Sequence, residues 1–395
     1  MISLRSVLSN HPRMRGFGGG LLMLALFGLI GLSLPLHAAD ALVCNFASTE
    51  ATNNFSTIAN WSCGRVPPAA DDVIVGAATS TLLTANIANI GSLAVTGTVN
   101  LGAFNLTVDG TTNVHAGGAV TLVSGNLTFT GAVSSTGSVT STAGAGNILF
   151  SNTFFNNGTL ALGSGTATTT GNATSTAGGT INIGSGTLVV MGNLDLTAST
   201  FNAGTGIVRF AGAAATQDIR PSTHGTASNT YFNNLESIRT GAGTVTVTAV
   251  TSTVLGYFTA SSTAATTYDF VTTNFSVGGS TSLNSNSTVT STSGNLYFGS
   301  TVTSSGAIGI GTTGNLFFGG TLQNNGTLSL GTTGIATTTG HVTSTGTFNG
   351  RSGTLVILGG LVNSGTFNPH TGTVKYRGSL SATRNLPAVL FYHLS

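Results

Sequence analysis

Ionisable residues that could act together in acid–base chemistry gather in one short segment of this 395-residue chain. Residues 213–240 contain Asp218, Arg220, His224, Glu236 and Arg239. Carboxylates and an imidazole that converge on a substrate can transfer protons, and paired carboxylates can cleave a glycosidic bond. If these residues act together, the segment suggests a carbohydrate-active β-helix enzyme, either a polysaccharide lyase or a hydrolase. This function is the alternative to the non-enzymatic role that the rest of the chain favours.

The rest of the chain offers little for catalysis. Charged residues make up 5% of the sequence, and residues 110–194 and 270–350 contain no Asp, Glu, Lys or Arg. Within these spans only His115 and His341 could titrate near neutral pH, and we expect both to be exposed turn residues. We therefore predict that the protein is not an enzyme and has no catalytic, cofactor-binding or metal-binding residue.

Two cysteines and two adjacent acids lie close together near the N-terminus. Cys44 and Cys63 are the only cysteines, and in an exported chain we expect them to form a disulfide, the alternative being two free thiols. Asp71 and Asp72 could suggest a metal site. Without further oxygen donors nearby, such a pair is more typical of turn or capping residues.

A repeat of about twenty residues must position all of these groups. Residues 159–212 show it three times, as TLALGSGTATTTGNATSTAGG, TINIGSGTLVVMGNLDLTAS and TFNAGTGIVRFAG. Twenty residues are too few for a domain but suit one coil of a solenoid. The sequence therefore predicts an all-β fold, a right-handed parallel β-helix with a small N-terminal cap.

Alternating apolar residues predict which side chains form the core, because residues two apart share one face of a strand. The pairs include Leu160/Leu162, Ile181/Ile183, Leu127/Phe129, Leu188/Val190 and Val208/Phe210. In this register Phe150, Phe210, Phe298 and Phe318 point inward and stack on their neighbours, and Phe317 points outward.

The repeat also divides the chain. We expect a signal peptide at 1–41, a disulfide-closed N-terminal cap at 42–75, a first β-helix array at 76–212, an irregular aromatic-bearing interruption at 213–285 and a second array at 286–395. NNGTLALG at 156–163 returns as NNGTLSLG at 324–331, which indicates a longer repeat of about 167 residues. Either the second array ends at residue 395 or the chain is a fragment of a longer array, which we favour.

The N-terminus has the order of a secretory signal. Arg5, Arg13 and Arg15 precede an apolar run at 17–36, and Ala39-Asp40-Ala41 fits a cleavage site; the alternative is a retained membrane anchor. Removing 1–41 takes away three of the 11 basic and one of the nine acidic side chains, which leaves eight of each. A net charge of zero argues against nucleic-acid binding, and we expect no membrane span in the mature chain.

The segment that precedes the repeats resembles the opening of many bacterial surface proteins. Asn60-Trp61-Ser62, Gly64-Arg65-Val66-Pro67 and Asp71-Asp72-Val73-Ile74-Val75 match the lead-in of autotransporter passengers and related repeat adhesins, and the coils resemble filamentous-haemagglutinin-type repeats. The chain departs from those families in showing neither C-terminal membrane-barrel strands nor a secretion domain. The resemblance implies a bacterial, pectin-lyase-like β-helix displayed outside the cell.

Together these features predict a non-enzymatic secreted or cell-surface β-helical rod with a structural or adhesive role. Its expected partners are surface glycans or other cell-surface proteins, and no cofactor. A third class, binding to ice or a crystal surface, would need a regular plane of threonines. Thr168-Thr169-Thr170 and Thr337-Thr338-Thr339 suggest one, but neighbouring coils carry Leu-Thr-Phe or Leu-Phe-Phe there, so no regular threonine plane is expected.

Overall fold

The computed structural model describes residues 41–47, 53–142, 144, 146–176, 178–197, 199–220, 229–248, 251–271, 274–377 and 393–394. The expected signal peptide, apart from residue 41, lies outside these residues. Within them the only helix is η1 (Ile58–Asn60), a single 3₁₀ turn, and all other regular elements are strands. None of the described segments forms a helix with the length and hydropathy needed to cross a membrane.

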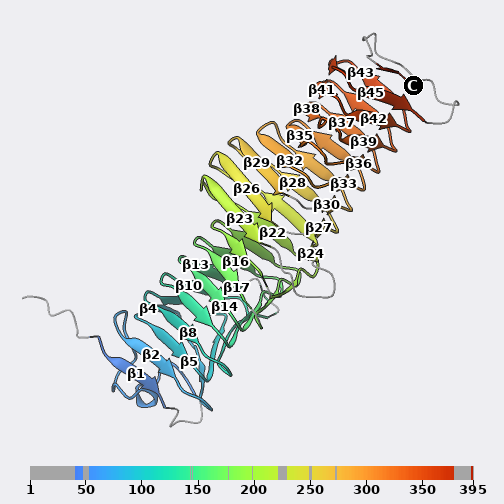
Figure 1. The fold of residues 1–395 in the computed structure, drawn as a ribbon. Helices are drawn as coiled ribbons and strands as arrows, with labels where there is room; N and C mark the ends of the chain where they lie inside the picture. The colour runs from blue at the N-terminus through green and yellow to red at the C-terminus, as the bar shows by residue number, and fades with distance from the viewer. Residues whose placement is uncertain are drawn as a thin grey trace, which may run out of the picture. The chain divides into compact units, whose positions relative to one another are not determined.

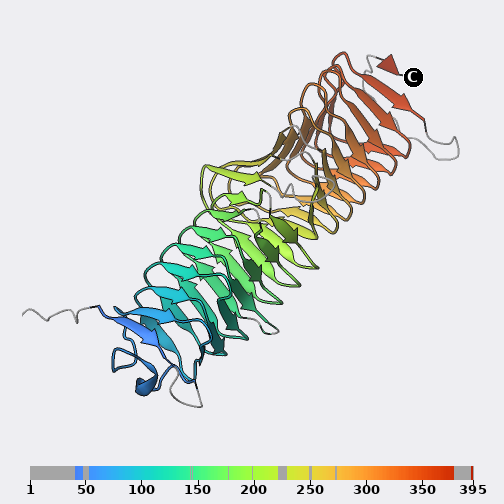
Figure 2. The same cartoon turned by 60° about the horizontal axis from the view of Figure 1, so that its bottom comes forward.

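The strands form a parallel β-solenoid of about 14 turns with roughly 21 residues per turn. A typical turn contributes three strands, so that a strand usually pairs in parallel with the strand three places later in the chain. The exceptions among the described residues are the first and last strand pairs and one break on the third side. Figures 1 and 2 show these turns following one another in sequence order, from blue to red. The predicted all-β parallel fold is confirmed.

Two sheets continue through both halves of the solenoid. The 16-stranded sheet consists, in spatial order, of β1 (Val43–Phe46), β2 (Asp72–Val75), β5 (Leu93–Val95), β8 (Thr112–Val114), β11 (Val133–Ser135), β14 (Phe154–Asn156), β17 (Ala173–Ser175), β20 (Leu194–Asp195), β23 (Thr216–Arg220), β26 (Gly243–Thr248), β29 (Thr266–Val271), β32 (Ser287–Ser291), β35 (Ala307–Ile310), β38 (Thr327–Ser329), β41 (Thr347–Asn349) and β44 (Thr366–Asn368). The 14-stranded sheet consists of β4 (Ile87–Ile90), β7 (Leu106–Val108), β10 (Asn126–Phe129), β13 (Asn147–Phe150), β16 (Thr166–Thr169), β19 (Thr187–Val190), β22 (Ile207–Phe210), β25 (Asn234–Ser237), β28 (Phe258–Ala260), β31 (Thr281–Leu283), β34 (Val302–Ser304), β37 (Leu322–Asn324), β40 (Val342–Ser344) and β43 (Leu361–Asn363).

The third side of the solenoid is divided between two sheets. The 7-stranded sheet of the first half consists of β21 (Thr200–Asn202), β18 (Thr180–Asn182), β15 (Thr159–Ala161), β12 (Ser138–Ser141), β9 (Ala119–Leu122), β6 (Thr98–Gly102) and β3 (Ser80–Leu82). The 9-stranded sheet of the second half consists of β24 (Asn229–Phe232), β27 (Thr251–Val254), β30 (Asn274–Val277), β33 (Leu296–Phe298), β36 (Leu316–Phe318), β39 (Ile335–Thr338), β42 (Thr354–Ile357), β45 (Thr373–Tyr376) and β46 (His393–Leu394).

The alternating apolar residues fill the interior, as the sequence predicts. Phe150, Phe298 and Phe318 are fully buried and Phe210 is 3% exposed. The rings of Phe298 and Phe318, on neighbouring coils, stack with centroids 5.6 Å apart and an interplanar angle of 14°. Phe317 is half-buried and lies 6.4 Å from Tyr297. The predicted register of these strands is therefore confirmed.

The segment 213–285 contains paired strands as well as a break in the repeat. β23, β26 and β29 pair in order within the 16-stranded sheet, while β25, β28 and β31 do so within the 14-stranded sheet. The coil here is longer, since Arg209 bonds to Glu236 across 27 residues. The third side is discontinuous at this point, because the 7-stranded sheet ends at β21 and the 9-stranded sheet begins at β24.

The copies of the longer repeat lie on different sides of the solenoid. Thr159–Ala161 forms β15 in the 7-stranded sheet, whereas its sequence counterpart Thr327–Ser329 forms β38 in the 16-stranded sheet. β15 and β38 are 23 strands apart, and 23 is not a multiple of three strands per turn. The second copy is therefore displaced by one side.

Candidate binding face and the sites around it

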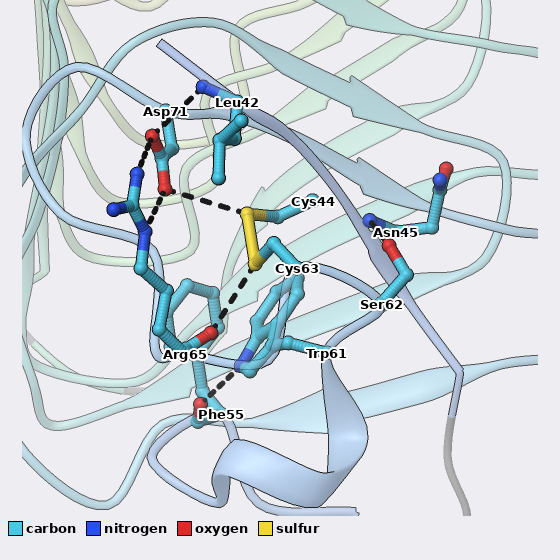
Figure 3. Close-up of a disulfide and its surroundings, with 9 residues drawn as sticks. All are labelled: Leu42, Cys44, Asn45, Phe55, Trp61, Ser62, Cys63, Arg65 and Asp71. Carbon is cyan, nitrogen blue, oxygen red and sulfur yellow. Dashed lines mark hydrogen bonds and ion pairs between the residues drawn. A yellow bond between two sulfur atoms is a disulfide. The ribbon is translucent and has the colours of Figure 1, made fainter. Parts of the chain in front are cut away.

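The N-terminal cap closes around Cys44 and Cys63. The two residues form a disulfide with Cα atoms 5.0 Å apart, within the usual range for such a bond (Figure 3). Trp61 packs edge-on against Phe46 and Phe55 and donates its indole N–H to the Phe55 carbonyl at 2.7 Å. The sequence predicted this pairing, and a thiol measurement on the protein is its direct test.

Asp71 is fully buried beside the disulfide and is held by Arg65. Arg65 Nη2 and Nε donate to the two Asp71 carboxylate oxygens at 2.7 and 3.0 Å, and the Leu42 amide donates at 3.0 Å (Figure 3). Burial opposes ionisation of the carboxyl, but these hydrogen bonds outweigh it and hold the pKa of Asp71 below its usual value. With a bidentate arginine on its two oxygens, Asp71 has a structural role here.

The cap also covers the edge of the strand at one end of the 7-stranded sheet. β3 is the last strand of the 7-stranded sheet, and its Leu82 exchanges backbone hydrogen bonds of 2.9 Å with the cap, through Phe55 N–H and Asn53 C=O. The Asp72 carboxylate accepts the Ser92 amide at 2.9 Å. An uncovered parallel edge would recruit other strands, so these contacts protect the start of the solenoid.

The ionisable residues of 213–240 do not converge on one site. Asp218 and Arg220 lie on β23 in the 16-stranded sheet, whereas Glu236 lies on β25 in the 14-stranded sheet. Arg239 is fully buried, and its guanidinium donates to Gln217 Oε1 at 2.7 Å and to the Ala214 carbonyl. His224 lies outside the described residues.

Glu236 is engaged by its neighbours on the surface of the 14-stranded sheet. Arg209 Nε donates to Glu236 Oε2 at 2.7 Å, and the Tyr257 hydroxyl donates to Oε1 at 2.7 Å. Burial, together with the hydrogen bond to this carboxylate, raises the pKa of Tyr257 to about 12. With both carboxylate oxygens engaged, Glu236 is part of a cross-strand ion pair rather than a free base.

Asp218 and Arg220 instead meet Asp195 of the preceding turn. The three side chains border a surface hollow of about 180 Å³, in which Arg220 Nη1 lies 3.6 Å from Asp195 Oδ2. Sequence reasoning missed this grouping because Asp195 lies outside the 213–240 segment. Two carboxylates in one hollow are the arrangement that glycoside hydrolysis requires, but the hollow is smaller than the roughly 300 Å³ at which ligand pockets usually begin.

A regular polar surface, which we call the polar face, covers the 16-stranded sheet from β23 to β44. It has two rows of outward side chains. The first, the threonine row, consists of Thr216, Thr244, Thr267, Thr288, Ala307, Thr327, Thr347 and Thr366. The second, the companion row, consists of Asp218, Thr246, Asp269, Thr290, Gly309, Ser329, Asn349 and Asn368.

The polar face repeats its chemistry at the spacing of parallel strands, about 4.8 Å per coil. Its side chains are exposed or half-buried, and the amide of Asn368 donates to Asn349 Oδ1 at 2.9 Å. A similar pair of rows lies on the 7-stranded sheet, where Thr159, Thr180 and Thr200 align. Regular threonine rows therefore exist, on strands other than those that suggested them in the sequence.

The two isolated histidines are exposed, as expected. His115 follows β8, and His341 accepts the Gly360 amide on Nδ1 at 3.2 Å. Neither histidine belongs to a group of residues that could hold a metal ion. Among the described residues the one such group is Cys44, Cys63 and Asp71, in which the cysteines form the disulfide and the carboxylate is bonded to Arg65.

Comparison with known proteins adds no family to this description. No family model matches the chain, and neither a curated protein nor a solved structure does. The β-solenoid is thus established from its own strand pairing.

Proposed function

We propose that this protein is a non-enzymatic, secreted or cell-surface β-helix with an adhesive or structural role, and that it binds surface glycans through the polar face. The observation that carries the proposal is the alignment of outward polar side chains, mostly hydroxyls and amides, in two rows along that face, on every strand except β35. Hydroxyls and amides form hydrogen bonds with sugars, and many weak contacts along a repeating surface give strong attachment by avidity. Export rests on the basic, apolar and small-residue order of residues 1–41.

Retention of the purified chain on immobilised glycans tests this proposal. Thr347→Glu places a charge within the threonine row, and Thr303→Glu is its matched control, because Thr303 is a half-buried outward residue on the 14-stranded sheet. We expect Thr347→Glu to lower retention at least tenfold and Thr303→Glu to leave it unchanged. Equal retention of both variants would show that the polar face is not the adhesive surface.

A carbohydrate-active enzyme remains the second candidate, favoured by the two carboxylates in the Asp195–Asp218 hollow. A polysaccharide-degradation assay separates the two functions. Release of new saccharide ends by the parent chain, lost in Asp195→Asn and Asp218→Asn variants that still bind glycans, would assign the enzyme class. We expect no release from either the parent or the variants.

A further inference from the structure

A hollow of about 440 Å³ interrupts the polar face at β35. Here the threonine row carries Ala307 between Thr288 and Thr327, and the companion row carries Gly309 between Thr290 and Ser329. The hollow is open to solvent and has hydroxyl groups on both sides, from Thr288 and Thr290 of β32 and from Ser329 of β38. Its volume lies within the range of ligand pockets.

The fold does not require glycine at position 309. A Cβ added to most glycines of this chain would meet a backbone oxygen, at 2.0 Å for Gly306 and 2.1 Å for Gly311. At Gly309 the nearest atoms would lie 3.9 Å away, which is ordinary contact, and the backbone is not in the left-handed region. Glycine inside a strand weakens the strand and often marks a place where a ligand approaches closely. Gly309 thus leaves space that a side chain could have filled.

Arg351 lines the same hollow from the turn after β41. Its φ angle is +46°, a left-handed conformation that non-glycine residues rarely adopt. At the same place in the first-half coils, four residues after the threonine that opens the strand, the chain uses Gly163, Gly184 and Gly204 with φ of +56°, +65° and +57°. In the part of the chain that the structure describes, no carboxylate pairs with Arg351.

The charged residues differ between the two sides of the hollow. Arg351 contributes a guanidinium at the β41 side. Asp269 lies two coils from Gly309 on the opposite side, where it accepts hydrogen bonds from Thr290 Oγ1 at 3.5 Å and Thr292 Oγ1 at 3.4 Å. A ligand would fit if it had a carboxylate at one end and hydroxyl donors at the other. A carboxylated sugar has both.

We infer that this hollow, bordered by Thr288, Thr290, Ser329 and Arg351, binds one carboxylated sugar unit of a glycan. The sugar's carboxylate pairs with Arg351, its ring lies over Ala307 and Gly309, and its hydroxyls face the Thr290 side. The inference rests on the proposed glycan-binding function and names the subsite and the class of sugar within it.

Matched ligands and matched variants test the subsite by isothermal calorimetry. Sialyllactose carries one carboxylated sugar that lactose lacks, and a glucuronate-terminated disaccharide carries a carboxylate where its carboxyl-reduced form has a hydroxymethyl group. We expect at least one acidic member to bind at least tenfold more tightly than its neutral partner. Equal binding within both pairs, or no binding by either, would overturn the inference.

Three variants alter the hollow without harming the fold. Gly309→Ser and Ala307→Thr fill it with side chains that neighbouring coils already carry, and Arg351→Gly removes the charge while relieving the left-handed backbone. Arg351→Gly should lower affinity for the acidic sugar about 10- to 100-fold, the cost of losing a charge-assisted hydrogen bond. All three should unfold at the same temperature as the parent or a higher one, because each suits the local backbone at least as well.

The controls repeat the same substitutions elsewhere. Ala119→Thr fills an outward position of the 7-stranded sheet, and His370→Gly relieves the equivalent turn (φ +50°) one coil beyond Arg351, outside the hollow lining. We expect both controls to bind like the parent. If the parent binds acidic glycans and all five variants bind equally, the subsite is wrong and the proposed function stands. If the parent is retained on none of the immobilised glycans, the proposed function fails together with the inference.

Discussion

The adjacent residues Phe318 and Phe317 offer a sharp test of how the coils are held together. Phe318 is fully buried and stacks on Phe298, while Phe317 is half-buried on the outer surface beside Tyr297. Full burial of a phenylalanine side chain contributes about 1.5–3 kcal/mol, and the cavity left by truncation adds to that loss. We expect Phe318→Ala to lower the free energy of unfolding by ~3–5 kcal/mol and Phe317→Ala by ~1 kcal/mol.

Urea unfolding measures the difference, and hydrogen exchange shows where it acts. In a solenoid each coil contacts only its neighbours, so protection should fall mainly in β33, β36 and β39. Equal losses for the two variants would refute the reasoning, because they would place the register of β36 one residue away from the structure. Loss of protection spread evenly from β1 to β45 would refute the local coupling of the coils.

Three further predictions concern the cap and one surface cluster. The pKa of Asp71 is lowered in the folded protein, so its ion pair with Arg65 should stabilise the cap at pH values above the carboxyl's usual pKa. This stabilisation should be lost as the pH falls through the lowered pKa. Asp71→Asn should abolish the acid-dependent loss, which Trp fluorescence follows. Cys44 and Cys63 should resist alkylation until a reductant is added, and mass spectrometry that finds both modified beforehand would contradict the disulfide. Tyr257 should titrate near pH 12 by ultraviolet absorbance, and because its pKa is raised, its contribution to stability should decline as pH rises from about 10 to 12. A midpoint near 10 would show that neither its burial nor its bond to the carboxylate holds in solution.

The core could be predicted from sequence because it depends on local alternation alone. Leu188 and Val190, two residues apart, are both buried whatever the number of residues in the turns around them. The repeat length and the parallel fold follow from the same pattern, since a twenty-residue unit buries its apolar side only against its neighbours.

The polar face could not be predicted in this way, because it depends on where each coil closes. The spacing along the threonine row shortens from 28 residues between Thr216 and Thr244 to 19 between Thr347 and Thr366. A fixed twenty-residue repeat therefore misaligns these positions. For the same reason Glu236 was grouped with Asp218 by sequence, whereas the long coil places it beside Arg209 on another sheet.

The one-side displacement between the two copies of the longer repeat bears on how such a chain diversifies. Duplicating a unit that holds a whole number of turns would extend one row of side chains in a single direction. Here the duplicated unit spans 23 strands, so the row that opens with Thr159 on the 7-stranded sheet reappears with Thr327 on the 16-stranded sheet. Extra residues alone do not cause such a displacement, because Arg209 and Glu236 still pair on one sheet across the long coil. The side of the solenoid on which a copied surface lies therefore depends on the number of strands in the copied unit, and that number can change without altering any residue of the surface.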